Sequence, residues 1–315
     1  MGTNSRRHFL QISAAAVVGA GIPEDLRMGG RAPSADGLTM PAASAKPLRL
    51  GLIVGIDNDP ESAIKKVHDL GVPTCQVSVG TFGLDLVNRL RSALDLYKIE
   101  ATSLVIGFPG PEVYDFYQGP ETIGLVPWRW REARIEASKK ASDFAKQCGI
   151  PAIQGHCGFI PENPNDGLYK ETVNAIREVA SYAKQNGQSF RYETGQETPI
   201  TMLRAIQDVG LDNQGVNFDC ANLIMYGKAY PVDALDVIGK YVQGVHAKDG
   251  LWPANPKELG EEVPIGKGKV DFPRVIEKLR ALNYTGTITI EREISGPQQM
   301  EDIRKEKEYL EQLIG

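Results

Sequence analysis

The chain has 315 residues, of which 42% are hydrophobic and 24% are charged; this composition is typical of a globular protein with one large core or two modest ones. Its formal net charge is -5, so it has no excess of basic residues for a phosphate backbone, which argues against nucleic acid as its main partner. Its four cysteines lack C-x-x-C spacing and predict neither a zinc knuckle nor a disulfide framework. A small, neutral molecule is the partner that the composition favours.

The first segment, MGTNSRRHFLQISAAAVVGAG, places Arg6 and Arg7 before a short apolar run rich in Ala and Val. This order of features resembles a twin-arginine export signal. The run is shorter than the ~20 apolar residues that a membrane-spanning helix needs, and Ala43-Ser44-Ala45 offers a small-x-small cleavage site. We therefore predict a signal peptide and linker at residues 1–45 and an exported, periplasmic domain at 46–315 without a stable membrane span; an uncleaved, tethered form stays open.

Short apolar runs rich in β-branched residues alternate with longer segments of helical periodicity through the rest of the chain. The predicted strands are residues 48–56, 74–79, 101–108, 152–156, 189–193, 215–219, 242–248 and 286–291. The predicted helices are residues 60–71, 83–98, 131–149, 168–187, 198–210, 231–239, 271–283 and 297–315. Several strands read as apolar on both faces, which is typical of buried parallel strands. The alternation predicts consecutive βα units.

Eight βα units within residues 46–315 match the size of a (β/α)8 TIM barrel, which is typically ~250 residues. The competing fold is an open, doubly wound sheet, which would carry a Gly-rich phosphate loop after its first strand. The segment IVGIDNDPES has no G-x-G-x-x-G, and this favours the barrel. Two long connections, residues 109–130 and 249–270, each follow a strand. In a barrel both lie over the C-terminal face, where such folds build active sites.

Metal-capable side chains stand at the ends of the last four predicted strands: Glu193, Asp219, His246 and Glu291. Parallel strands bring their ends to one rim, so we expect these side chains to lie together. Three clustered carboxylates repel one another, and a divalent cation is the natural way to hold them. An imidazole with three carboxylates suits Mn²⁺, Mg²⁺ or Co²⁺ better than a thiolate site would. We predict Mn²⁺, with Zn²⁺ also open.

Several motifs carry a family resemblance when they are read in order. They are YETGQETP, GVNFDCANL, VHAKDG, VPIGKGKVDF and TGTITIERE. Together they resemble the xylose-isomerase-like barrel superfamily, the sugar isomerase/epimerase group that includes ketose 3-epimerases and inosose-processing enzymes. The resemblance covers the chain from about residue 48 to residue 315.

The resemblance implies a metal site made of Glu193, Asp219, His246 and Glu291, position by position. It also implies that the two glutamates are catalytic and move protons on opposite faces of a carbon beside a carbonyl. Such proton transfer is chemically reasonable, because a cation on the carbonyl oxygen stabilises the enediolate that forms when the proton leaves. The chain departs from some ketose epimerases at Asn222, where they carry a His, and in lacking their Arg soon after the metal His.

Four further residues are predicted to contact the substrate: His156, Lys248, Asn222 and Trp128. His156 ends a strand and faces the same cavity, although a hydrogen-bonded structural His is the alternative. Trp128 lies in the long connection after the third strand and could stack on a sugar ring or simply staple the connection to the barrel. Asp249, directly after Lys248, is expected to support the metal site or cap its loop.

These expectations combine into a metal-dependent isomerase or epimerase that acts on an unphosphorylated sugar or keto-sugar by removing a proton next to a carbonyl. The nearest alternative is a lyase or hydratase of 3-keto-glycosides that uses the same enolate chemistry. A non-catalytic sugar-binding protein is a third reading. The related abasic-site endonucleases are disfavoured by the acidic charge. The sequence leaves the oligomeric state open, including a homo-oligomer.

Overall fold

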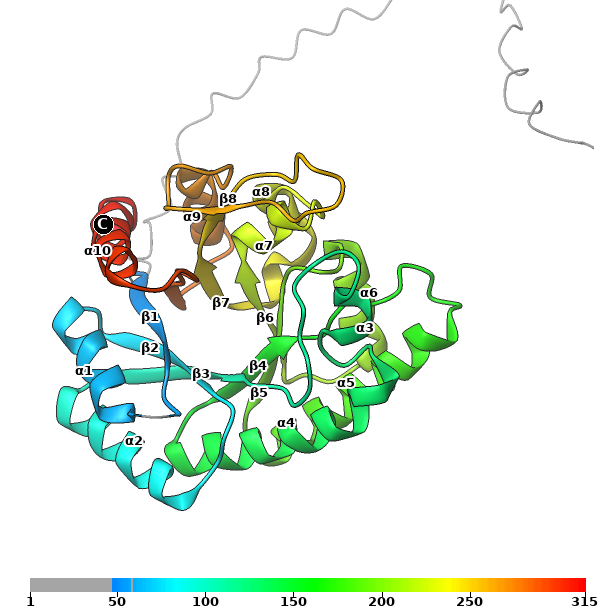
Figure 1. The fold of residues 1–315 in the computed structure, drawn as a ribbon, viewed down its shortest axis with the longest axis horizontal. Helices are drawn as coiled ribbons and strands as arrows, with labels where there is room; N and C mark the ends of the chain where they lie inside the picture. The colour runs from blue at the N-terminus through cyan, green and yellow to red at the C-terminus, as the bar shows by residue number, and fades with distance from the viewer. Residues whose placement is uncertain (1–46, 58) are drawn as a thin grey trace, which may run out of the picture. The chain divides into compact units, whose positions relative to one another are not determined.

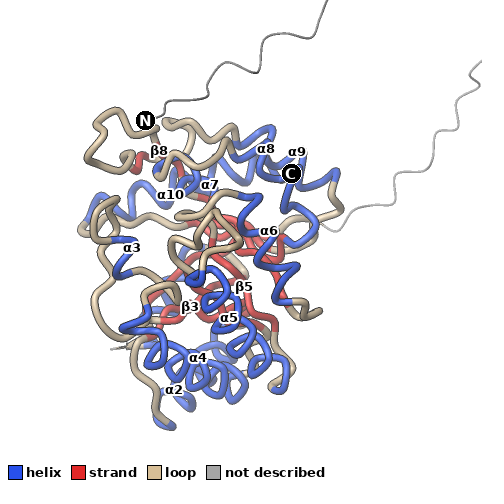
Figure 2. The backbone as a smooth tube through the Cα atoms, turned by 90° about the vertical axis from the view of Figure 1, so that its right-hand side faces the viewer, coloured by secondary structure: helices blue, strands red, loops and turns tan. Residues whose placement is uncertain are grey.

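The computed structural model describes residues 47–57 and 59–315, so the predicted signal peptide lies outside the described residues. Eight parallel strands form a closed barrel in the order β1-β10-β7-β6-β5-β4-β3-β2. Figure 1 follows the chain around this barrel, and Figure 2 shows the helices lying outside the strands. The predicted (β/α)8 fold is confirmed.

Each barrel strand is followed by a helix that covers its outer side. The barrel strands are β1 (Arg49–Gly55), β2 (Thr74–Val79), β3 (Glu100–Ile106), β4 (Ala152–His156), β5 (Ser189–Glu193), β6 (Gln214–Asp219), β7 (Val242–Ala247) and β10 (Thr287–Ile290). The covering helices are α1 (Pro60–Leu70), α2 (Leu84–Tyr97), α4 (Trp128–Cys148), α5 (Gly167–Gln185), α6 (Pro199–Val209), α8 (Pro231–Ile238), α9 (Phe272–Ala281) and α10 (Pro297–Ile314).

Smaller elements lie in the connections at the C-terminal ends of the strands. They are α3 (Gly119–Thr122), α7 (Cys220–Met225), β8 (Asp249–Gly250) and β9 (Glu262–Val263); a single 3-10 turn, Gly239–Tyr241, precedes β7. None of them was predicted. They are too short to show a helical or strand period in the sequence.

The helix α4 begins at Trp128, three residues before the predicted start, so Trp128 lies in a first helical turn and not in a loop as expected. Pro127 precedes the helix in an extended conformation and marks the boundary. The neighbouring Trp130 packs so closely on Gly110 that a Cβ there would lie 2.6 Å from the indole ring. Gly110 has a φ of 84°, a conformation that also favours glycine.

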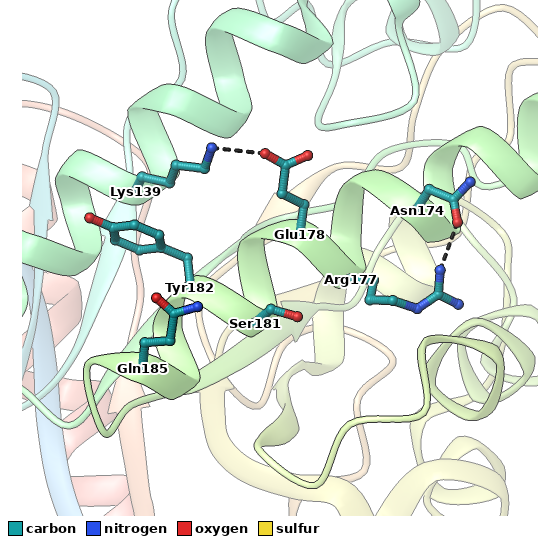
Figure 3. A pocket seen from close by; sticks show the side chains of 7 residues that line it. All are labelled: Lys139, Asn174, Arg177, Glu178, Ser181, Tyr182 and Gln185. Atoms are coloured by element: carbon teal, nitrogen blue, oxygen red, sulfur yellow. Dashed lines mark hydrogen bonds and ion pairs between the residues drawn. The ribbon is translucent and has the colours of Figure 1, made fainter.

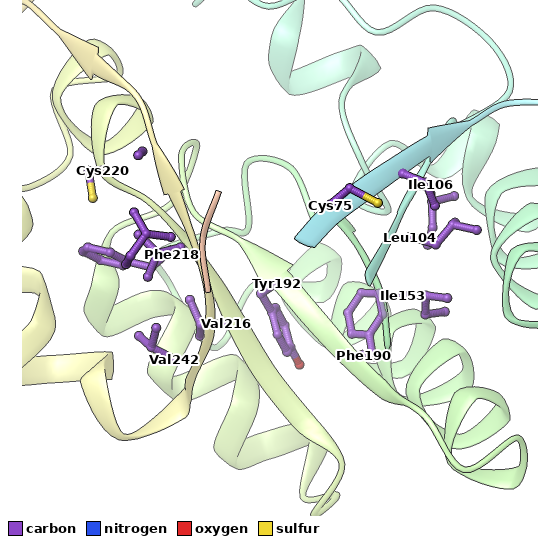
Figure 4. Close-up of a cluster of buried hydrophobic side chains, with 14 of the residues drawn as sticks. Cys75, Leu104, Ile106, Ile153, Phe190, Tyr192, Val216, Phe218, Cys220 and Val242 are labelled. Atoms are coloured by element: carbon purple, nitrogen blue, oxygen red, sulfur yellow. The ribbon is translucent and has the colours of Figure 1, made fainter. Parts of the chain in front are cut away.

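The apolar core lies between the strands and the helices. Figure 4 shows Leu104, Ile153, Phe190 and Phe218 pointing into this layer, and each of them is almost completely buried. Cys220 lies in the same layer, as its alternation with the inward-facing Asp219 predicts. These contacts hold the helices on the barrel and fix the strand ends that carry the candidate site.

The inside of the barrel is polar, which corrects the expectation of strands that are apolar on both faces. Gln76, Ser103, Gln154 and Asn217 are each 0% exposed and alternate with the apolar residues that face the helices. Barrels of this class usually fill the interior with Val, Ile and Leu. Here hydrogen bonds between side chains take their place, and they lie directly below the candidate site.

The long connection at residues 249–270 is held by one carboxylate. Asp249 accepts the backbone N–H groups of Gly266 (2.9 Å), Gly268 (3.0 Å) and Val270 (3.0 Å), as well as that of Gly250. A loop-capping role for Asp249, one of the two roles predicted, is confirmed. These bonds therefore hold residues 266–270 against the start of the connection at Asp249 and Gly250.

Candidate metal centre

Four side chains from neighbouring strands converge at the C-terminal rim of the barrel. Glu193 ends β5, Asp219 ends β6, His246 lies in β7 and Glu291 follows β10. One ligand atom from each lies within 4.8 Å of the other three. His246 Nδ1 lies 3.3 Å from Glu193 Oε1, 3.5 Å from Asp219 Oδ2 and 3.1 Å from Glu291 Oε2. The sequence therefore identified the members of this cluster and their common rim.

The spacing of these atoms fits a divalent cation. Two ligands about 2.1 Å from one ion and about 90–110° apart are separated by roughly 3.0–3.4 Å, close to the distances from His246 Nδ1 to the three carboxylates. Among the described residues, His246 Nδ1 is a buried atom without a hydrogen-bond partner, and Asp219 Oδ2 and Glu291 Oε2 are buried atoms that meet the ammonium of Lys248 at 3.1 Å and 2.9 Å. Buried polar atoms are normally paired, so the free lone pair of His246 Nδ1 beside these oxygens is consistent with ligation of an ion.

The charges of the cluster shift the pKa values of its members. Burial favours the neutral carboxylic acid, but His246 and Lys248 outweigh it and lower the pKa of Glu291 well below its usual value. Burial raises the pKa of Asp219 even though Lys248 opposes that shift. Burial opposes the charged imidazolium, yet Glu291 and Glu193 raise the pKa of His246 well above its usual value. The carboxylates of the rim thus favour positive charge on the nitrogen groups beside them.

Lys248 is part of this charge balance. Its ammonium lies 3.1 Å from Asp219 Oδ2, 2.9 Å from Glu291 Oε2 and 3.3 Å from Glu293 Oε1, and its side chain is only 1% exposed. This ion-paired position of Lys248 was not predicted from the sequence. A substrate contact by Lys248 stays a prediction.

His156 lies next to the cluster on β4, the strand that follows β5 around the barrel. Its Nε2 is 3.5 Å from Glu193 Oε1, and its Nδ1 is buried without a partner. The ring of Tyr114, from the connection after β3, meets the His156 ring edge-on at 5.7 Å. Tyr114 was not predicted, because nothing in a long connection shows which aromatic ring will meet a side chain at a strand end.

The remaining predicted contacts are placed differently. Asn222 lies in α7, where its backbone N–H donates to Asp219 Oδ1 (2.7 Å) and its side-chain amide donates to the carbonyl of Thr194 (3.3 Å). Asn222 therefore positions Asp219 as the N-terminal cap of α7. Trp128 is 70% exposed and lies beside the Arg129 guanidinium. Substrate contacts by Asn222 and Trp128 stay predictions.

A concave surface lies on the outside of the barrel, between α4 and α5. It has a volume of about 440 Å³ and is lined by polar residues, with Lys139 paired to Glu178 at 2.8 Å (Figure 3). Arg177 there bonds Asn174. Its lining includes one carboxylate, Glu178, and no His, so it lacks the converging metal-capable side chains of the rim cluster.

No helix within the described part of the chain is long and apolar enough to cross a membrane.

Over 198 residues the chain is 28% identical to the uncharacterized protein MJ1311 of Methanocaldococcus jannaschii, a match that covers 59% of this chain and 64% of that protein. The chain therefore spans less than two thirds of this relative's length. A crystal structure of a xylose isomerase domain protein from Planctomyces limnophilus is 36% identical, with a TM-score of 0.80, and the match covers 85% of this chain and 97% of the other.

Two more distant structures share the fold. One is 3-keto-D-glucoside 4-epimerase, YcjR, from E. coli, with 15% identity, a TM-score of 0.64 and coverage of 84% of this chain and 99% of the other. The second is a xylose isomerase-like TIM barrel protein from Mycobacterium smegmatis in complex with magnesium, with 17% identity, a TM-score of 0.63 and coverage of 87% and 98%. Residues 64–313 match the family described as xylose isomerase-like TIM barrel, and the chain belongs to that family.

Proposed function

We propose that this protein is a metal-dependent isomerase or epimerase of an unphosphorylated sugar or keto-sugar, with Glu193, Asp219, His246 and Glu291 as metal ligands. The observation that carries the proposal is the convergence of these four ligand atoms within 4.8 Å. Sugar epimerases among the proteins of the same fold support the substrate class. The oxygen-rich ligand set favours Mn²⁺ or Mg²⁺, and a magnesium complex with this fold is consistent with that choice.

The arrangement of the glutamates suits proton transfer next to a carbonyl. Glu193 and Glu291 come from β5 and the end of β10, the two outer strands of the arc β10-β7-β6-β5. A substrate held over the cluster would thus meet one carboxylate on each side, so that one glutamate removes the C–H proton and the other returns it. When bound, a divalent cation would polarise the carbonyl and offset the charge that develops on its oxygen.

Other residues of the chain support this step. Lys248 keeps Glu291 ionised through their 2.9 Å ion pair, and His156 does the same for Glu193 at 3.5 Å when it is protonated. An ionised carboxylate is the form that accepts a proton. His156 Nδ1 is buried and unpartnered, which leaves it available to a substrate hydroxyl.

The proposal is tested by incubating the Mn²⁺-loaded protein in D₂O with a panel of ketoses and 3-keto-glycosides. Deuterium in an intact, epimerised sugar is the expected result. Release of an aglycone would identify a lyase or hydratase instead. Sugar binding without metal-dependent hydrogen exchange would identify a non-catalytic sugar-binding protein.

We also propose that the protein reaches the periplasm by the twin-arginine route, on the basis of Arg6 and Arg7 in the segment SRRHFL. Such export carries folded proteins, so the metal would be loaded before export, where Cu²⁺ and Zn²⁺ compete less. Cell fractionation of the full chain tests this. The variant with both arginines changed to lysine should stay in the cytoplasm; its unchanged export would reject the route.

A further inference from the structure

His246 is held from both sides. Its Nδ1 faces the three carboxylates of the cluster, while its Nε2 lies 2.7 Å from Gln76 Oε1 on β2. The imidazole is 0% exposed. A histidine that uses one nitrogen as a metal ligand needs the proton on the other nitrogen, and the partner of that other nitrogen decides where the proton resides.

The orientation of Gln76 is fixed by a network across the barrel interior. Gln154 donates through Nε2 to Gln76 Oε1 (2.8 Å), and Gln76 donates through Nε2 to Asn217 Oδ1 (3.1 Å). Ser103 donates through its hydroxyl to Gln154 Oε1 (2.7 Å). All four residues are 0% exposed, so water does not compete for these bonds.

The direction of these bonds determines the role of His246 Nε2. The atom of Gln76 that faces the imidazole already accepts a hydrogen bond from Gln154, so it is the carbonyl oxygen and has no proton to give. Gln154 Nε2 also lies 3.4 Å from His246 Nε2, but Gln76 Oε1 is much closer at 2.7 Å, so His246 Nε2 is the donor to Gln76. A neutral His246 then carries its proton on Nε2 and presents the Nδ1 lone pair to Glu193, Asp219 and Glu291.

We propose that Gln76, oriented by Gln154 and Asn217, is a positioning residue that fixes His246 in the Nε2–H form and aims Nδ1 at the cation. The inference rests on the metal site of the proposed function. It adds a determinant of metal affinity that lies on the opposite side of the barrel from the ligands, on β2, and that touches neither substrate nor cation.

Two measurements test the proposal. The first is nitrogen-15 NMR of His246 in the Mg²⁺-loaded wild-type protein, where we expect the proton on Nε2; a proton on Nδ1 would overturn the proposal without any mutation. The second is Mn²⁺ affinity by competition titration. Gln76→Leu removes the acceptor and should weaken Mn²⁺ binding about 10- to 100-fold.

Two further variants separate positioning from packing. Gln76→Glu keeps an acceptor oxygen and should bind Mn²⁺ more tightly than Gln76→Leu. Gln188→Leu removes another buried glutamine, which bonds Ser142 and the carbonyl of Ile150 outside this network, and should leave affinity unchanged. Equal affinities of the wild type and Gln76→Leu would overturn the proposal. Absence of Mn²⁺ binding by the wild type would instead reject the metal site of the proposed function.

Discussion

The buried ammonium of Lys248 lies beside two of the three carboxylates that a single cation would also have to share. Two of its contacts, 3.1 Å to Asp219 and 2.9 Å to Glu291, go to the same oxygen atoms that approach His246. With one divalent ion, the charges of Glu193, Asp219, Glu291 and Lys248 sum to zero. Without the ion, Lys248 and a protonated His246 are the positive charges that the described residues bring to this cluster.

Replacing Lys248 by Met should therefore destabilise the metal-free protein by roughly 3 kcal/mol or more, because it leaves buried carboxylates without their cation. Mn²⁺ supplies the missing positive charge, so it should raise the melting temperature of Lys248→Met more than that of the wild type. Thermal unfolding with and without Mn²⁺ measures both effects. Lys269→Met, at an exposed lysine, is the control, and equal Mn²⁺ shifts in wild type and Lys248→Met would contradict this charge balance.

The two proposed proton-transfer residues can be compared with a close neighbour. Glu193→Gln and Glu291→Gln should each slow solvent deuterium exchange into the substrate by about 10²- to 10⁴-fold, because an amide cannot accept the proton. Glu293→Gln changes a carboxylate that is 57% exposed and outside the four-residue cluster, and it should have a much smaller effect. A larger loss in Glu293→Gln than in Glu291→Gln would transfer the role to Glu293.

At the scale of the elements, the connections over the rim are organised by carboxylates that bind backbone N–H groups. Asp249 uses both of its oxygens: Oδ1 accepts from Gly250 and Val270, and Oδ2 accepts from Gly266 and Gly268. Gly268 packs so closely that a Cβ would lie 2.1 Å from Asp249 Oδ1. Asp115, in the other long connection, uses only Oδ1 for its three backbone N–H groups.

This difference predicts unequal effects of the same substitution. Asp249→Asn replaces one acceptor oxygen by an N–H₂ group and should cost about 1–3 kcal/mol for each N–H left without an acceptor. Asp115→Asn can keep its single accepting oxygen and should be nearly neutral. Urea unfolding measures the free energies, and proteolysis within residues 251–264 reports local loosening. Equal stability of the two variants would refute the bidentate role of Asp249.

The helix α10 closes the same connection through Glu306, whose Oε1 accepts the Ile265 N–H (3.2 Å). Burial raises the pKa of Glu306 from 4.5 to about 7. A raised pKa means that the folded state binds this proton more tightly than the unfolded state. Its contribution to stability is thus full below pH 4.5 and is lost as the pH rises through 7.

The variant Glu306→Gln should remove this pH dependence while keeping the acceptor for Ile265. We expect the free energy of unfolding of the wild type to fall more between pH 5 and pH 8 than that of Glu306→Gln. Urea titrations at both pH values measure the difference. Glu308→Gln, at an exposed position of α10, should behave like the wild type; parallel pH profiles of wild type and Glu306→Gln would argue against a raised pKa.

At the scale of the whole molecule, the sequence predicted the rim better than the interior beneath it. Glu193 and Asp219 were found because a polar residue that ends an apolar run in successive βα units must reach a common edge. Gln76 and Gln154 were missed, although Gln154 stands two residues before His156 and thus on the same face. Gln76 and Gln154 bond each other although they are 78 residues apart in the chain, and no local period shows which inward polar side chains will meet.

The closed barrel connects the rim cluster to the hydrogen bonds beneath it. The predicted metal ligands lie on β5, β6, β7 and after β10, while the side chains that donate the hydrogen bonds beneath them lie on β2, β3 and β4. An ion that binds the rim of the folded barrel should therefore stabilise it as a unit. Mn²⁺ at 100 times its Kd should add about 2.7 kcal/mol to the free energy of unfolding of the wild type, and a chelator should remove this gain. Asp219→Asn weakens the ligand set and should lose most of it, whereas Asp236→Asn, at an exposed residue of α8, should keep it. An equal gain in Asp219→Asn would mean that Mn²⁺ stabilises the fold from another position.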